Sequence, residues 1–254
     1  MGLDIVLYIL FGFIAQMIDG ALGMAYGVSS TTLLLGMGVP PVSASASVHT
    51  AEVFTTFVSG IAHHRLGNVN KRLFLMLAVP GALGGMLGAW VLSLETIGKL
   101  IKPGVSVYLI LMGVVILVKA LRRKSDSRPA GDLGKKTIGL GFIGGLMDAM
   151  GGGGWGPIVT STMIARGNHP QTTIGSVNAA EFFVTLAQVT TFAFLLTNWL
   201  EYGQIILGLL IGGVLAAPLA ALVSKRARPK SLMLGVGVLV IVTNIYTLYK
   251  IFAG

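Results

Sequence analysis

The sequence predicts an all-α polytopic membrane protein of two inverted repeats, each a re-entrant pair of half-helices followed by three transmembrane helices. Three observations predict this fold: long apolar runs, a duplication at a constant offset, and a glycine-rich break near the start of each copy. Of the 254 residues, 54% are hydrophobic and 11% are charged, and the mean hydropathy is +0.84. Soluble domains carry about 25% charged residues, so we expect the lipid bilayer to surround this chain.

The duplication appears as a repeat at an offset of 129 residues, and twelve residues between positions 19 and 56 recur identically. The chain has only nine acidic residues, yet four of them form two pairs at this offset inside apolar sequence. These pairs are Asp19 with Asp148 and Glu52 with Glu181. We therefore expect the duplicated carboxylates to serve chemistry as well as fold.

Each copy opens with an apolar element that glycines interrupt, over about residues 3–37 and 137–165. About a dozen residues separate Lys136 from Asp148, which is about 18 Å of helix, whereas the hydrocarbon core is about 30 Å thick. We expect each opening element to enter the bilayer about halfway and to leave on the side it entered.

Six apolar runs of spanning length follow, at about residues 42–62, 73–94, 104–118, 173–197, 204–223 and 232–249. A polar, charged segment at 122–136 joins the copies and is predicted to be a flexible linker. The expected organisation is a first membrane repeat at 1–121, a cytoplasmic linker at 122–136 and a second membrane repeat at 137–254. Close helix packing explains a further set of glycines: Gly81, Gly84, Gly85, Gly88, Gly208 and Gly212.

The basic residues predict the orientation. With re-entrant opening elements, segments 61–72, 119–136, 166–170 and 224–230 share one side and hold 15 Lys and Arg, against 3 on the other side. A single crossing by each opening element would give 11 against 7. Since cytoplasmic loops carry the basic excess, we expect a multi-pass protein of the cytoplasmic (inner) membrane with both termini periplasmic. The net charge of +9 then reports orientation and not a nucleic-acid partner.

The four repeated carboxylates are predicted near the bilayer midplane. Each Glu lies eleven residues beyond a helix-starting proline, about 16 Å along the helix, and the half-helix tips reach a similar depth. A charge there costs about 2.5 to 3.5 kcal/mol or more, so it must face a cavity or a partner. We predict proton-coupling or gating roles for Asp19, Glu52, Asp148 and Glu181. Alternatively, each Asp caps the following half-helix and each Glu locks two helices together.

The glycine-rich breaks predict an anion site, because each begins a half-helix whose N–H groups and positive dipole end point to the midplane. We expect the substrate to contact Gly23, Gly27, Gly152, Gly153, Gly154 and Gly156. Neighbouring donors are predicted at Ser47, His49, Ser176 and Asn178. His49 and Asn178 each precede a Glu by three residues, which places them on the same helix face, and His49 can also titrate.

Several classes of function are excluded or disfavoured. The absence of cysteine excludes disulfides, thiolate metal sites and cysteine nucleophiles. No nucleophile and base pair is recognisable, so we expect neither an enzyme nor a cofactor.

Three features of the sequence resemble the TauE/SafE sulfite exporter family over essentially the whole chain. They are the duplicated break, the stretch Met-Asp-Ala-Met-Gly-Gly-Gly-Gly-Trp-Gly-Pro at 147–157, and His-His-Arg-Leu-Gly-Asn-Val-Asn at 63–70. The resemblance implies a small two-repeat protein that moves sulfite, sulfonates or related anions. The first break departs from the fuller pattern, with Met24, Ala25 and Val28 where the second has Gly153, Gly154 and Pro157.

The leading hypothesis is a secondary transporter that exports a small anion, such as sulfite or an organosulfonate, by movement of one repeat against the other. Buried glutamates offer a carrier for a coupled proton. The alternative is a metal or other cation transporter in which the midplane carboxylates and His49 coordinate the substrate.

Overall fold

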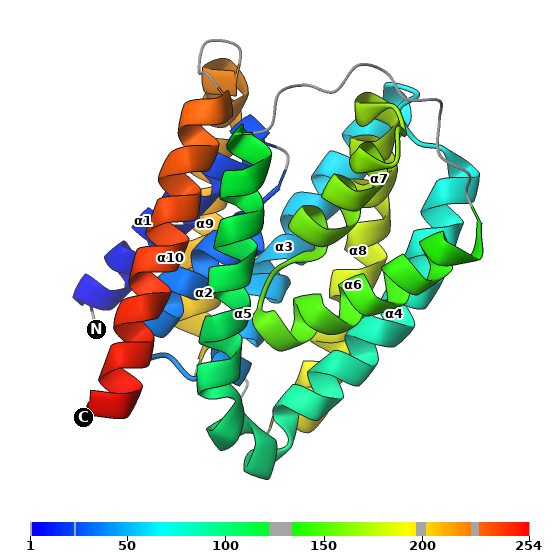
Figure 1. The fold of residues 1–254 in the computed structure, drawn as a ribbon. Helices are drawn as coiled ribbons and strands as arrows, with labels where there is room; N and C mark the ends of the chain where they lie inside the picture. Colours follow the sequence, from blue (N-terminus) through cyan, green and yellow to red (C-terminus); the bar gives the residue numbers. More distant parts are fainter. Residues whose placement is uncertain (1, 23, 122–133, 197–201, 225–228, 254) are drawn as a thin grey trace.

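The computed structural model describes residues 2–22, 24–121, 134–196, 202–224 and 229–253. Within these residues the chain is almost entirely helical and contains no β-strand (Figure 1). The all-helical, polytopic architecture predicted from the sequence is therefore confirmed.

The same series of elements occurs twice along the chain. The first series is α1 (Gly2–Leu22), α2 (Tyr26–Gly36), α3 (Pro41–Arg65), α4 (Lys71–Ser93) and α5 (Glu95–Leu121). The second is α6 (Lys135–Gly151), the π-helical turn η1 (Gly156–Thr160), α7 (Ser161–Ala165), α8 (Pro170–Leu195), α9 (Gly203–Ser224) and α10 (Pro229–Ala253). The helix of η1 and α7 takes the place of α2.

Each predicted apolar run coincides with one of six long helices, α3, α4, α5, α8, α9 and α10. Over the described residues, four segments are both long and apolar enough to cross a membrane: Lys71–Ser93, Pro103–Leu121, Thr172–Leu195 and Met233–Ala253. Helix α3 is equally long at 25 residues but more polar, because Ser43, Ser45, Ser47, His49 and Glu52 interrupt it. All five are buried, so the polar side of α3 faces protein instead of lipid.

The opening element of each copy folds as two helices with a break between them. In Figure 1, α1 and α6 lie obliquely to the upright α5 and α10, and the chain turns back after each break. These two helices contain 21 and 17 residues and are longer than the predicted half-helices. An oblique path needs more residues to reach a given depth, which accounts for the difference.

Helices from the two copies pack against one another in matching pairs: α1 on α9, α4 on α6, α3 on α8 and α5 on α10. Glycines permit two of these contacts. A Cβ atom on Gly208 or Gly212 would overlap α1 at Tyr8 and Ile9, and one on Gly84 would overlap the backbone of α6. The close-packing role expected for these glycines is confirmed.

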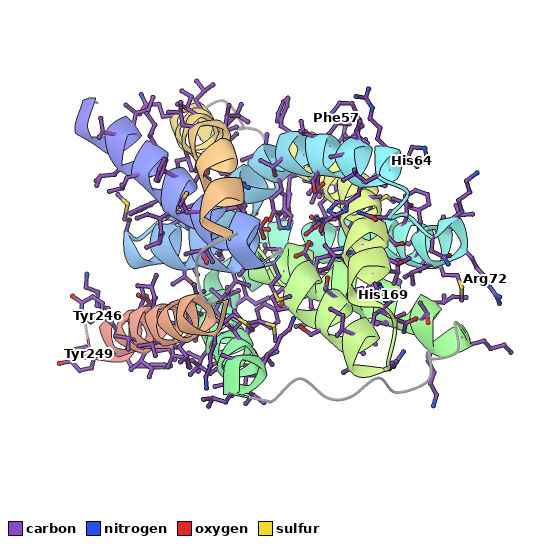
Figure 2. All side chains as sticks on the ribbon, turned by 90° about the horizontal axis from the view of Figure 1, so that it is seen from above. Phe57, His64, Arg72, His169, Tyr246 and Tyr249 are labelled. Atoms are coloured by element: carbon purple, nitrogen blue, oxygen red, sulfur yellow. The ribbon has the colours of Figure 1, made fainter. Side chains whose placement is uncertain are left out.

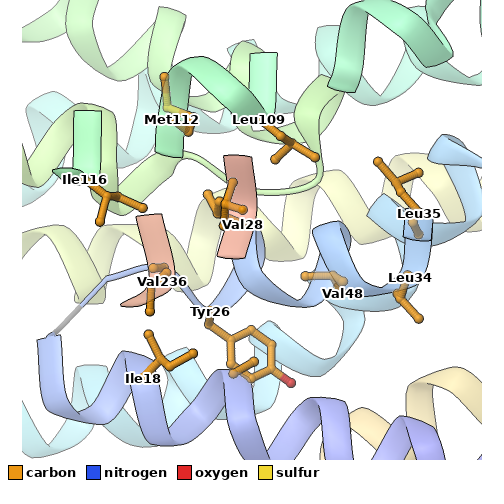
Figure 3. Close-up of a cluster of buried hydrophobic side chains, with 14 of the residues drawn as sticks. Ile18, Tyr26, Val28, Leu34, Leu35, Val48, Leu109, Met112, Ile116 and Val236 are labelled. Carbon is orange, nitrogen blue, oxygen red and sulfur yellow. The ribbon is translucent and has the colours of Figure 1, made fainter. Parts of the chain in front are cut away.

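The helices that follow the breaks, which we call the returning helices, run through the interior of the protein. They are α2 in the first copy and η1 with α7 in the second. Val28, Leu34 and Leu35 of α2 pack with Leu109 and Met112 of α5 in the largest buried apolar cluster (Figure 3). In the other copy, Trp155, Val159 and Met163 fill a second cluster between α4 and α8. Non-helical backbone at membrane depth is tolerated only where protein surrounds it, and both breaks meet this condition.

Large apolar side chains cover the outside of the bundle. Figure 2 shows them projecting outward from helices on all sides, and the most exposed of them are Phe194 at 86% and Phe252 at 78%. Soluble monomers rarely expose large continuous apolar surface. The outer face is therefore suited to contact with lipid.

The connections between helices lie at two opposite ends of the bundle. The α3–α4 connection and the ends of α5 and α7 lie at the upper edge in Figure 1, together with the start of α10. The C-terminus and the α4–α5 connection lie at the lower edge. The helix ends at the upper edge thus flank the segments that are richest in Lys and Arg.

Candidate functional site

The two breaks meet at the centre of the molecule. Gly27, in the first turn of α2, lies so close to the second break that an added Cβ would fall 2.7 Å from the Cα atom of Gly153. The same Cβ would fall 3.0 Å from Oε1 of Glu52 on α3. The glycine at position 27 is therefore required for the contact between the two copies.

An aspartate holds the start of the returning helix in each copy. Oδ1 of Asp19 accepts a hydrogen bond from the Tyr26 N–H at 3.3 Å, and Oδ1 of Asp148 accepts one from the Trp155 N–H at 2.8 Å. Each acid precedes its donor by seven residues. The geometry agrees with the capping role considered above as the alternative to gating, in which a side-chain oxygen satisfies an orphan helix N–H.

The second break adopts backbone conformations that favour glycine. Gly152, Gly153 and Gly154 have φ angles of +67°, +147° and +151°, and the carbonyl groups of the first two accept hydrogen bonds from the other copy. The Thr31 hydroxyl donates to the Gly152 carbonyl, and the Tyr108 hydroxyl donates to the Gly153 carbonyl at 3.0 Å. These bonds anchor the second break to α2 and α5 of the other copy.

The first break also contains a positive φ, at a residue that is not glycine. Ala25, which is equivalent to Gly154 at the 129-residue offset, has φ +97° and is the only described non-glycine residue with a positive φ. A side chain in this region costs about 1 to 2 kcal/mol. The backbones of the two breaks agree only in part, because φ is positive at Gly153 but not at its equivalent Met24.

A small cavity of about 30 Å³ lies between the breaks. Carboxyl groups from both copies line it: Asp19, Glu52, Asp148 and Glu181. The other lining residues include Tyr26, Gly27, Val28, Gly154, Trp155, Gly156, Pro157 and Asn178. The structure thus brings together the four acids that the duplication predicted, next to the starts of both returning helices.

The Glu52 carboxyl is only partly satisfied. It accepts a hydrogen bond from the Gly27 backbone N–H, whereas its Oε2 atom is buried and has no hydrogen-bond partner. This oxygen lies 3.8 Å from Nε2 of His49, one helical turn earlier on α3. Glu52 therefore connects the cavity to a more deeply buried polar group.

That group is a network around Asp148 that joins α3, α6 and α8. Oδ2 of Asp148 lies 3.1 Å from Nε2 of His49 and accepts a hydrogen bond from Nε2 of Gln188 at 3.0 Å. The Ser45 hydroxyl donates to the Ala149 carbonyl at 2.6 Å, which adds a second link between α3 and α6. Among the described residues, no group of three His, Asp or Glu side chains has an arrangement that could hold a metal ion.

Comparison with known proteins shows the family to which this chain belongs. The sulfite exporter TauE/SafE family model matches residues 8–247. The chain belongs to the TauE/SafE family. It is also similar to the "Probable membrane transporter protein YtnM" of Bacillus subtilis (strain 168), with 39% identity over 252 residues that cover 96% of this chain and 82% of the relative. No solved structure matches. The chain is thus a multi-pass membrane transporter.

The structure separates the predicted site residues into two groups. Gly27, Gly154, Gly156 and Asn178 line the cavity with the four acids. The residues that do not line it are Ser47, His49, Gly152, Gly153 and Ser176. Gly23 lies outside the described residues.

The two predicted serine donors differ in their surroundings. Ser176 accepts from the Asn70 N–H at 2.8 Å and donates to the Thr172 carbonyl, so its hydroxyl serves the start of α4. Ser47 is fully buried, and its hydroxyl has no hydrogen-bond partner. Neither hydroxyl faces the cavity.

Sequence reasoning missed three polar residues of the site. Gln188 corresponds to Ser59 at the 129-residue offset. A search for identical residues in the two copies does not find this pair, because the two residue types differ. Ser45 lies four residues before His49, where an i, i+4 contact on α3 offers a weak signal. Tyr108 reaches the second break from a helix of the other copy, and no local pattern marks it.

Proposed function

We propose that the chain is a secondary transporter that exports a small oxyanion, such as sulfite or an organosulfonate, across the cytoplasmic membrane together with protons. The family description names sulfite. The observation that carries the proposal is the cavity in which two helix starts meet four carboxyl groups from both copies.

The anion is proposed to bind at the two helix starts. Gly27 and Gly156 lie in the first turns of α2 and η1, and both line the cavity. Helix starts attract anions through their N–H groups and positive dipole end. Asn178 adds a side-chain amide to the same lining.

The carboxyl groups make this binding depend on protons. Four carboxylates around one cavity would repel an anion, whereas protonated carboxyl groups would not. Protons and anion then strengthen each other's binding, and the coupling is reciprocal. We expect anion affinity to rise as pH falls, within the range in which the substrate stays ionised.

The proposed topology is a pair of inverted repeats, 1–121 and 137–254, joined by a cytoplasmic linker at 122–136. The contacts between the copies support this topology. Helix α1 of the first copy packs on α9 of the second, and their counterparts α6 and α4 pack on each other in the same way. Helices α3 and α5 each pack on their own counterpart, α8 and α10. In this topology the upper edge of Figure 1 is cytoplasmic and both termini are periplasmic. Movement of one repeat against the other would open the central cavity to each side in turn.

The test is anion efflux from vesicles that contain the purified protein, with sulfite inside and the internal pH varied. The wild-type rate should rise as internal pH falls. Glu52→Gln and Glu181→Gln keep the size and hydrogen bonding of the side chain but cannot titrate, so each should slow efflux by about tenfold, or about 1.4 kcal/mol. The exposed His64→Asn is the matched control. Normal efflux by both Gln variants at every pH would refute proton coupling through these residues.

One observation favours a second candidate, a cation transporter: four carboxyl groups line the cavity, and carboxylate oxygens are ligands for hard cations. A ligand that binds the folded state raises its melting temperature. Thermal shifts with sulfite, sulfate, thiosulfate, sulfonates and divalent metals therefore separate the two candidates. Stabilisation by a divalent metal and by none of the anions would replace the first proposal with the second.

A further inference from the structure

The contact between His49 and Asp148 requires a proton between them. Nδ1 of His49 lies 2.7 Å from the Ser45 carbonyl oxygen, which only accepts hydrogen bonds, so Nδ1 carries a hydrogen. In a neutral ring Nε2 is then an acceptor, yet it lies 3.1 Å from Oδ2 of Asp148. Two acceptors at this distance repel each other. One proton therefore sits on Nε2 or on Oδ2.

The Asp148 carboxyl is fixed in this position. Its Oδ1 accepts from the Trp155 N–H, and its Oδ2 accepts from Gln188. Both His49 and Asp148 are buried, with relative exposures of 0% and 2%. The shared proton thus joins α3 of the first copy to α6 of the second copy at the site where the second returning helix starts.

Glu52 is the open acceptor next to this pair. Its Oε2 has no hydrogen-bond partner, lies 3.8 Å from Nε2 of His49, and belongs to a side chain that lines the cavity. Both Asp148 oxygens, in contrast, already accept hydrogen bonds. The other ionisable groups near the pair are Asp19 of α1, Tyr26 of α2, Tyr108 of α5 and Glu181 of α8.

The equivalent positions in the other half lack this proton. At the 129-residue offset, His49 corresponds to Asn178, Asp148 to Asp19, and Gln188 to Ser59. Asn178 donates from Nδ2 to the Ser59 hydroxyl at 3.1 Å. An amide does not titrate, so the duplicated site has a proton-bearing pair in one half only.

We propose that His49 and Asp148 form a proton-dependent latch between α3 and α6, opened when their shared proton passes to Oε2 of Glu52. This inference rests on the proposed proton-coupled transport. The transfer leaves a protonated Glu52, a neutral His49 and an Asp148 carboxylate, so the number of protons is conserved. Nε2 and Oδ2 then face each other as two acceptors, and the α3–α6 contact weakens. Glu52 exchanges its proton with the cavity, and the reverse transfer closes the latch.

Nitrogen NMR of the histidine ring tests the shared proton without measuring transport. The chain has four histidines, so replacing His63, His64 and His169 with Asn leaves His49 as the only one. At neutral pH the Nε2 signal should be that of a protonated nitrogen or of one sharing a proton. Asp148→Asn should shift it to an unprotonated nitrogen, because an amide can donate to Nε2. An unprotonated Nε2 signal that Asp148→Asn leaves unchanged would overturn the inference.

Vesicle efflux tests the coupling. His49→Asn copies the residue of the other half and removes the latch proton. The pH dependence of efflux should therefore fall by about half or more, whatever the remaining rate, because Glu52 can no longer exchange a proton with His49. His169→Asn, at an exposed position, should behave as wild type. A wild-type pH profile in His49→Asn would overturn the latch and leave the proposed transport intact. If the wild type moved no anion, the proposed function would fail, and the NMR result would still decide where the proton lies.

Discussion

At the scale of single residues, Asp19 and Asp148 occupy equivalent positions but carry different numbers of contacts. Among the described residues, Asp19 accepts a backbone hydrogen bond from Tyr26. Asp148 contacts the Trp155 N–H, His49 and Gln188. Both aspartates cap a helix, but only Asp148 also belongs to a buried hydrogen-bond network. The two carboxylates should therefore contribute differently to the free energy of unfolding.

We predict that Asp148→Ala lowers the free energy of unfolding more than Asp19→Ala does. Loss of a cap costs about 1 kcal/mol, which is the effect expected at Asp19. At Asp148 the same change also removes the partner of His49 Nε2 and one acceptor of Gln188 Nε2, and breaking a buried pair costs about 3 to 5 kcal/mol. Denaturant unfolding of the detergent-solubilised variants measures both values.

The double variant with Gln188→Ala supplies the control for this comparison. Because Gln188 donates to Asp148, the effects of the two changes should not add. Additive effects, or equal losses at Asp19 and Asp148, would contradict the assigned network.

At the scale of elements, the two breaks differ in sequence and share only part of their backbone conformation. Ala25 holds a positive φ at the position where the second break has Gly154. A positive φ at a residue with a side chain leaves local strain in the first break. Tertiary contacts must offset it, and the buried side chains of α2 provide them.

Reciprocal substitutions at these positions should have opposite effects. Ala25→Gly should raise stability by about 1 kcal/mol, because it removes the strain of a side chain at positive φ. Gly154→Ala should lower it by more, because the new Cβ would also overlap the Tyr108 hydroxyl. Melting temperatures of the two variants check both signs, and a less stable Ala25→Gly would show that Ala25 is not strained.

The sequence allowed most elements to be predicted, since apolar runs of spanning length and glycine-rich breaks are local patterns. The duplication also predicted that Glu52 and Glu181 lie at the same depth, because each lies eleven residues beyond a helix-starting proline. The partners of Asp148 were not predictable in this way. Gln188 and Tyr108 reach the site from other helices, and only the packing of α5, α6 and α8 determines which of their atoms meet.

At the scale of the whole molecule, the two copies share an architecture but not a chemistry. Both have an acid-capped returning helix and a glutamate at the cavity. At the 129-residue offset, however, the titratable His49 is replaced by the amide of Asn178. If the repeats are inverted, this difference assigns the proton-dependent contact to one of the two access routes. The inverted duplication would then provide two alternative access routes. The difference between His49 and Asn178 would couple one of these routes to a proton.

The proposed orientation leads to the last prediction, which uses the absence of native cysteine. Ser127→Cys in the linker and Gly254→Cys at the C-terminus each introduce a single thiol. An impermeant thiol reagent applied to intact cells should label position 254 and not position 127, because 15 of 18 basic residues mark the linker side as cytoplasmic. Asn68→Cys, in the α3–α4 connection, should be protected like position 127, and both should react once the membrane is permeabilised. Labelling of 127 and 68 with protection of 254 would invert the molecule, whereas an identical outcome at positions 127 and 254 would mean that the second opening element crosses the bilayer completely.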